Sequence, residues 1–187
     1  NFDSIIKELS KIIQDLNTLR NSAKQDELAK EITRELDLFS SISQISGGVK
    51  ENQITDLASF LLFNQLLFYR IYRQRVEDSG LPPLSDVKNP IKDLQNYFNL
   101  IKNKGYHAIY NVNILKHIQD NPQVNKTINR AITSFRLINA NMLTHDVVGR
   151  FFHALIPHDA AKVLATFYTH PNAAAILAGL SIKHDQE

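Results

Sequence analysis

The stretch from Ile54 to Tyr72 constrains the fold more than any other part of the chain. A helix here would carry large apolar side chains around most of its circumference: Leu57, Phe60, Leu61, Phe63, Leu66, Leu67, Phe68 and Ile71. Such a helix must be buried on nearly every side. Four polar residues interrupt the segment, namely Asp56, Asn64, Gln65 and Arg70. Because no apolar run reaches the roughly 18–20 residues of a membrane span, we predict a buried central helix over about residues 52–78 and no membrane segment.

The segments on both sides of this helix have helical periodicity too. Between residues 5 and 19 the apolar positions recur at steps of three and four: Ile5, Ile6, Leu9, Ile12, Ile13, Leu16 and Leu19. Asp3 or Ser4 is expected to cap this helix. Similar patterns predict further helices at about residues 26–45, 90–102, 123–137, 146–156, 157–164 and from 171 onward.

No segment has a convincing strand pattern, so the sequence predicts an all-α fold, a bundle of about seven to nine helices. Gly47–Gly48 and Ser79–Pro83 supply the breaks around the central helix. The aromatic stretch 106–112 does not fit either periodicity clearly. We expect residues 1–140 to form the bundle and residues 141–187 to form a further helical segment, together in one compact domain.

Composition excludes several classes of protein. With 43% hydrophobic residues the chain is not of the disordered type, and without cysteine it has no disulfide, thiolate metal site or cysteine nucleophile. The first residues show no signal peptide, and together with the missing cysteines this leads us to expect a cytoplasmic location. The histidines His145, His153 and His158 lack the spacing of a helical zinc pair, so no metal site is predicted.

The charge distribution favours the second half of the chain as the basic one. Through Asp78 there are ten Lys and Arg against twelve Asp and Glu, and afterwards eleven against seven. Five basic residues of this half could contact a DNA backbone: Lys116, Lys126, Arg130, Arg136 and Arg150. Arg130 and Arg136 are six residues apart and do not share a helical face well. An ordinary solvated surface is the interpretation that the sequence favours for these five residues, with DNA contact as the alternative.

Two segments near the end of the chain carry the most specific pattern. Asp146–Pro157 ends in Leu155-Ile156-Pro157, and Phe167-Tyr168-Thr169 follows about ten residues later, within Leu164-Ala165-Thr166-Phe167-Tyr168-Thr169-His170-Pro171 and ahead of a run of small residues. This arrangement resembles the segment that leads into the catalytic domain of N6-adenine DNA methyltransferases of restriction-modification systems. In that family the pattern has a Gly where Ala165 stands and commonly a Pro where His170 stands.

The resemblance implies that residues Thr166, Phe167, Tyr168, Thr169, His170 and Pro171 form one wall of an S-adenosylmethionine pocket. Amide groups at the start of the helix at Pro171, with the Thr169 hydroxyl, would face the methionine end of the cofactor. The alternative is an ordinary helix start in which Thr169 is a cap and Phe167 and Tyr168 belong to the core.

The catalytic motifs of that family do not occur in this sequence. There is no Asp-Pro-x-x-Gly-x-Gly loop and no Asn-Pro-Pro-Tyr, and Leu81-Pro82-Pro83-Leu84 lacks the amide and the aromatic ring. We therefore expect no catalytic residue here and no methyl transfer by this chain alone. The resemblance implies that residues 141–187 lead into a catalytic domain beyond Glu187, either in a type I modification subunit or in a fused type II restriction-methylation enzyme. Its partners would be DNA and the specificity or restriction subunits. The rival hypothesis is a freestanding helical protein-interaction module without a cofactor.

Overall fold

The computed structural model describes residues 2–35 and 51–137. These residues form six α-helices: α1 (Phe2–Asn17), α2 (Gln25–Glu35), α4 (Glu51–Arg75), α5 (Pro90–Lys102), α6 (His107–Tyr110) and α7 (Pro122–Leu137). Three 3-10 turns connect them: η1 (Thr18–Ser22), η2 (Leu84–Asp86) and η3 (Ile114–His117). Within the described ranges there is no strand, only an isolated bridge between Ala23 and Ile118. The all-α prediction is confirmed, although six helices are fewer than the seven to nine predicted for the whole chain. The helices predicted after residue 140, and the boundary there, lie outside the described residues.

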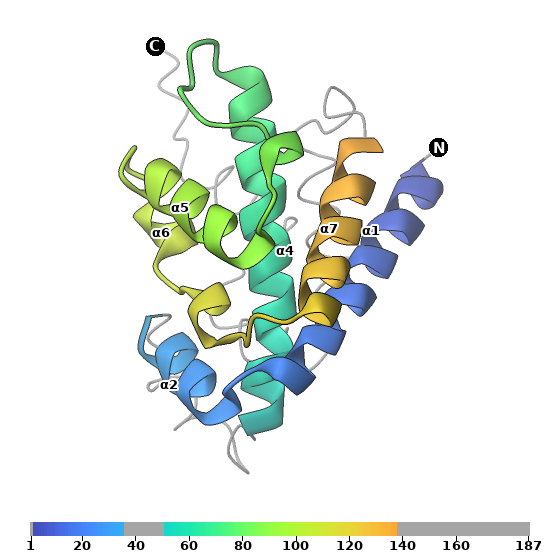
Figure 1. The fold of residues 1–187 in the computed structure, drawn as a ribbon, viewed down its shortest axis with the longest axis vertical. Coiled ribbons are helices and arrows are strands. Elements are labelled where there is room, and N and C mark those ends of the chain that lie inside the picture. The colour runs from blue at the N-terminus through green and yellow to red at the C-terminus, as the bar shows by residue number, and fades with distance from the viewer. Residues whose placement is uncertain (1, 36–50, 138–187) are drawn as a thin grey trace, which may run out of the picture.

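Helix α4 is the centre of the bundle, as its apolar circumference predicted. It runs through the middle of the molecule, with α1 and α7 on one side and α5 and α6 on the other (Figure 1). Its side chains Leu57, Phe63, Leu66 and Tyr69 are at most 1% exposed. The helix ends at Arg75, three residues before the predicted end. Burial of these large side chains against five other helices makes a large hydrophobic contribution to this fold.

Helices α1 and α7 pack against each other and against α4. Leu9, Ile12 and Leu16 of α1 are buried, as are Ile128 and Phe135 of α7. The predicted cap of α1 is wrong, because the helix already begins at Phe2 and Asp3 and Ser4 lie in its first turn. An acidic residue is also favourable there, since the first turn carries the positive end of the helix dipole.

The aromatic stretch that did not fit a periodicity is held against α4 by buried hydrogen bonds. The Gln65 side-chain amide donates to the carbonyl oxygens of Ile109 (3.0 Å) and Val112 (2.9 Å). The Tyr110 hydroxyl donates to the backbone carbonyl oxygen of Gln65 at 2.7 Å. These contacts fix the short helix α6 and the turn after it, which local sequence alone would not stabilise.

Local signals set the bounds of α5, which agree with the prediction. Asn89 precedes the helix, and its side-chain oxygen accepts from the Lys92 N–H at 3.2 Å, while Pro90 occupies the first helical position. The Asp93 carboxylate accepts from the N–H groups of Lys88 and Asn89, both at 2.8 Å. These two backbone hydrogen bonds hold the pKa of Asp93 below its usual value.

Candidate functional site

The predicted cofactor wall, residues 166–171, lies outside the described residues, as do Arg150 and the histidines His145, His153 and His158. The structure therefore does not test the S-adenosylmethionine pocket. It does place four of the five basic residues considered for DNA contact. Two of them, Lys126 and Arg130, lie together in one groove, whereas Arg136 lines a separate pocket and Lys116 lines neither.

The groove runs between α1 and α7 and has a volume of about 950 Å³. We call it the α1–α7 groove. It is lined by Lys11, Asp15, Pro122, Asn125, Lys126, Asn129, Arg130, Thr133 and Ser134. Three of these side chains are basic and one is acidic, so the groove is positive overall. Lys126 and Arg130 are four residues apart and therefore share one face of α7.

Polar groups fill the rest of the groove. The Thr133 hydroxyl donates to the Asn129 carbonyl at 2.9 Å, and the Asn125 amide donates to the Asp120 carboxylate at 2.7 Å. At the Pro122 end lies the start of α7, where the Asn121 side chain accepts from the Val124 N–H at 3.0 Å. This end carries the positive pole of the helix dipole. Amides, hydroxyls and cations of this kind suit an extended polyanion better than an apolar ligand.

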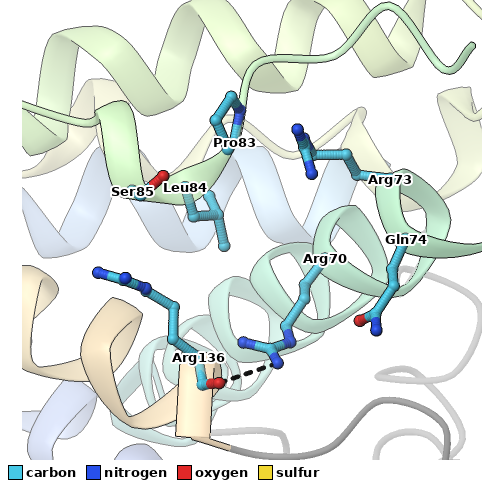
Figure 2. A pocket seen from close by; sticks show the side chains of 7 residues that line it. All are labelled: Arg70, Arg73, Gln74, Pro83, Leu84, Ser85 and Arg136. Carbon is cyan, nitrogen blue, oxygen red and sulfur yellow. Dashed lines mark hydrogen bonds between the residues drawn. The ribbon is translucent and has the colours of Figure 1, made fainter.

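The second basic region is smaller, and we call it the arginine pocket. It has a volume of about 270 Å³ and is lined by Arg70, Arg73, Gln74, Pro83, Leu84, Ser85 and Arg136. Figure 2 shows that Arg70, Arg73 and Gln74 come from α4 and Arg136 from α7, while Pro83, Leu84 and Ser85 belong to the segment that passes across them. The Arg70 guanidinium donates through Nη2 to the Arg136 carbonyl oxygen at 3.1 Å.

Like charges meet in this pocket, and none of its lining residues within ranges 2–35 and 51–137 is acidic. Burial, and then the charge of Arg136, lower the pKa of Arg70 from its ordinary value. Arginine nevertheless stays protonated in proteins at neutral pH. The pocket therefore concentrates three positive charges, those of Arg70, Arg73 and Arg136, in a small volume.

A third polar cluster is largely buried, and one edge of it reaches the exposed Glu27, whose Oε2 lies 3.6 Å from His117 Nδ1. His117 Nε2 lies 2.6 Å from Glu31 Oε2, and the two side chains are 5% and 10% exposed. The other Glu31 oxygen accepts from the Asn113 N–H at 2.7 Å. Burial by itself raises the pKa of Glu31, but the hydrogen bonds from His117 and from the Asn113 backbone outweigh it and leave that pKa below its ordinary value.

This pair joins elements that are distant in sequence, α2 and η3. Next to it, the Lys24 N–H donates to the His117 carbonyl at 2.9 Å and the Gln119 N–H donates to the Ser22 carbonyl at 2.8 Å. Neither Glu31 nor His117 lines the groove or the arginine pocket. Across residues 2–35 and 51–137 no group of three or more potential ligands could hold a metal ion. The Glu31–His117 pair connects α2 to the turn at η3.

The sequence contained signals for both buried partners that periodicity alone did not bring out. Glu31 stands between Leu28 and Ile32, three residues from one and next to the other, which places it on the apolar stripe of its helix. His117 stands directly before Ile118 and close after Ile114 and Leu115, all three of them apolar. A charged residue inside an apolar stripe indicates a buried partner, because burial without one is strongly unfavourable. Which residue is the partner depends on the tertiary structure.

Comparison with known proteins finds no match: no protein family, no curated protein and no solved structure corresponds to this chain. Among the described residues no helix is long and apolar enough to span a membrane. This agrees with the interpretation of the Ile54–Tyr72 segment as a buried helix. The functional argument therefore depends on the chain's own residues.

Proposed function

We propose that this chain is the helical amino-terminal domain of an N6-adenine DNA methyltransferase of a restriction-modification system. The observation that carries the proposal is the sequence pattern of Asp146–Pro157 followed by Leu164–Pro171. An all-α bundle preceding that pattern is compatible with it. In the longer protein, residues 166–171 would complete the S-adenosylmethionine pocket, and the bundle would help to hold the DNA.

The α1–α7 groove is the surface that we assign to DNA. Lys11, Lys126 and Arg130 would neutralise backbone phosphates, and Asn129 would donate a hydrogen bond to phosphate or sugar oxygens. None of these four side chains is buried. Contacts of this kind fix the position of a protein on a duplex without reading its bases. The groove would therefore supply affinity, and sequence specificity would come from elsewhere in the enzyme.

The test is DNA binding by the full chain carrying Lys126→Gln and Arg130→Gln together. Fluorescence anisotropy with a labelled duplex of mixed sequence would be followed at several salt concentrations. Each lost phosphate contact lowers the slope of log affinity against log salt by about one, so we expect a decrease of about two.

A matched control removes the same number of charges elsewhere. Lys30 and Lys104 are exposed and do not line the groove, so Lys30→Gln with Lys104→Gln should leave the slope nearly unchanged. If both double variants reduce the slope equally, the DNA contact is a general charge effect and the groove has no particular role.

The cofactor wall is tested in a longer protein that contains the catalytic motifs. Thr169→Ala should weaken S-adenosylmethionine binding about tenfold or more, because a hydrogen bond to a charged group contributes about 1.5–3 kcal/mol. Calorimetric titration would measure the affinity, with thermal melts to exclude unfolding. If the folded variant binds as tightly as the parent protein, Thr169 is a helix cap only. The present chain alone should transfer no labelled methyl group to DNA.

The rival hypothesis, a freestanding interaction module, predicts an exposed apolar face on the first two helices. In the described part of α1 and α2 the large apolar side chains are buried or packed against the core. Large apolar side chains that are exposed occur at Val76 and Leu100, which belong to neither helix. The described surface therefore gives this alternative no support.

A further inference from the structure

We propose that the arginine pocket binds a small phosphate-bearing ligand through Arg70, Arg73 and Arg136. The pocket lies where the last turns of α4 meet the end of α7 and the segment Leu81–Ser85 (Figure 2). It is separate from the α1–α7 groove, so this proposal does not depend on the proposed DNA contact.

The pocket walls are held in place by hydrogen bonds to the backbone. Arg70 donates to the Arg136 carbonyl, and Arg73 Nε donates to the Leu81 carbonyl at 3.0 Å. The Tyr69 hydroxyl donates to the Pro82 carbonyl at 2.7 Å and so fastens the same segment to α4. Two of the three guanidinium groups are thus positioned before a ligand arrives, which reduces the entropy lost on binding.

Arg73 and Arg136 retain N–H groups that are available to bind an anion. Within the described part of the chain, the Arg136 side chain makes no hydrogen bond or ion pair, and Arg73 uses one of its five N–H groups. Asp86 follows Ser85 and accepts from its hydroxyl at 3.1 Å, but it does not line the pocket. Guanidinium forks match the oxygens of a phosphoryl group in pairs. A bound phosphate would also offset the repulsion between Arg70 and Arg136.

Size and charge together limit the ligand. A volume of about 270 Å³ lies just under the range of about 300–1,000 Å³ for typical small-molecule pockets. The N–H groups that Arg73 and Arg136 present to the pocket suit a ligand with two or three negative charges. These values fit a phosphate monoester or a diphosphate group, free in solution, better than the single charges spaced along a duplex.

The ends of α4 and α7 provide a purely structural reason for arginines here, since cations are favourable at helix carboxyl termini. The experiment must separate that role from binding. Arg136→Gln is the suitable variant, because the bond between α4 and α7 uses the Arg136 backbone carbonyl and not its side chain. The fold should therefore be retained when the charge is lost.

The full chain would be titrated with inorganic pyrophosphate by calorimetry at constant ionic strength, with sodium chloride in the reference titration. We expect one binding site, and an affinity about tenfold lower for Arg136→Gln and for Arg73→Gln. Arg130→Gln is the matched control, since it removes the same charge from the same helix but lines the α1–α7 groove. It should leave the affinity for pyrophosphate within about twofold of the parent chain.

Duplex DNA forms the second arm of the experiment. If the pocket serves a small ligand, Arg136→Gln should bind a duplex as the parent chain does, while Arg130→Gln binds it more weakly. Absence of pyrophosphate binding, or equal weakening by Arg136→Gln and Arg130→Gln, would overturn the proposal. Loss of duplex affinity in Arg136→Gln without a pyrophosphate signal would also overturn it, because the phosphate would then belong to the DNA.

Discussion

The two ends of this bundle differ in the charged side chains that they bring together. At one end of the bundle, where α2 lies (Figure 1), Glu31 of α2 and His117 of η3 are buried, with Nε2 and Oε2 2.6 Å apart. At the other end, near the ends of α4 and α7 (Figure 1), Arg70, Arg73 and Arg136 line one pocket, and none of the described residues that line it is acidic. In the first cluster the charged carboxylate has a hydrogen-bonded partner, whereas the second brings together side chains of the same charge.

The difference separates a structural cluster from a binding cluster. A buried charge with a hydrogen-bonded partner holds two elements together, and removing the partner leaves an unfavourable buried charge. Arg70 and Arg73 also make hydrogen bonds to backbone carbonyls, but the repulsion between like charges in this group lowers the stability of the folded state slightly. Such a group of cations is suited to binding an anion from solution. Substitutions at the first end should therefore change stability, and substitutions at the second end should change binding.

The largest effect is expected in α4, which supports both ends. Phe63 is 1% exposed and its ring lies 5.3 Å from that of Phe135, measured between centroids. Phe63→Ala should lower the free energy of unfolding by about 3–5 kcal/mol, because it leaves a cavity in the core. Urea denaturation would measure this. A loss below about 0.5 kcal/mol at both Phe63 and Leu67 would contradict the central position of α4.

The next effect is at the paired end. Glu31→Ala should lower the free energy of unfolding by about 3 kcal/mol, since it removes the partner of His117 and of the Asn113 N–H together. Lys30→Ala is the matched control, being on the same helix and exposed, without a contact to His117. Urea titrations of both variants would show whether the buried pair matters. Equal losses in the two variants would mean that α2 is simply sensitive to substitution.

The pH dependence should be weaker than the effect of removing Glu31. The pKa of Glu31 in the folded chain is below its ordinary value of 4.5, so the ionised carboxylate stabilises the fold. This contribution is fully present above pH 4.5 and is lost as the pH falls through the lower folded-state pKa. Urea midpoints between about pH 6 and pH 3 should therefore fall less steeply in Glu31→Gln than in the parent chain. Parallel curves would exclude a role for Glu31 ionisation.

The smallest effect on stability is expected at the arginine end. Arg136→Gln should change the free energy of unfolding by less than about 0.5 kcal/mol, because its exposed side chain makes no described hydrogen bond and repels Arg70. Thermal melts of this variant beside Glu31→Ala would show the contrast directly. A loss of 2 kcal/mol or more would mean that the arginines are structural and that the two ends of the bundle do not differ.

Much of the fold could be predicted because helical signals are local. The bounds of α5 follow from Asn89, Pro90 and the apolar spacing after them, and α7 begins within one residue of its predicted start. The short helix α6 could not be predicted in this way. Its position depends on Gln65, which is 44 residues before the carbonyl of Ile109 to which it donates.

For the basic residues, too, local spacing predicted some features and long-range contacts determined the others. Periodicity correctly separated Arg130 from Arg136, since six residues do not return to the same face of a helix. It did not indicate that Arg136 would join Arg70, which is 66 residues away in the chain. Nor did it bring Lys11 of α1 beside Lys126 of α7.

The sequence by itself determined an all-α chain, the central position of α4 and the pattern at residues 146–171 on which the proposed function depends. Each of these features depends on residues only a few positions apart in the chain, because the geometry of a single helix fixes their spacing. Only the tertiary structure decided which charges are compensated. Glu31 gains His117 as a partner, whereas Arg70, Arg73 and Arg136 come to line one pocket, because packing sets distances between residues that the sequence leaves far apart.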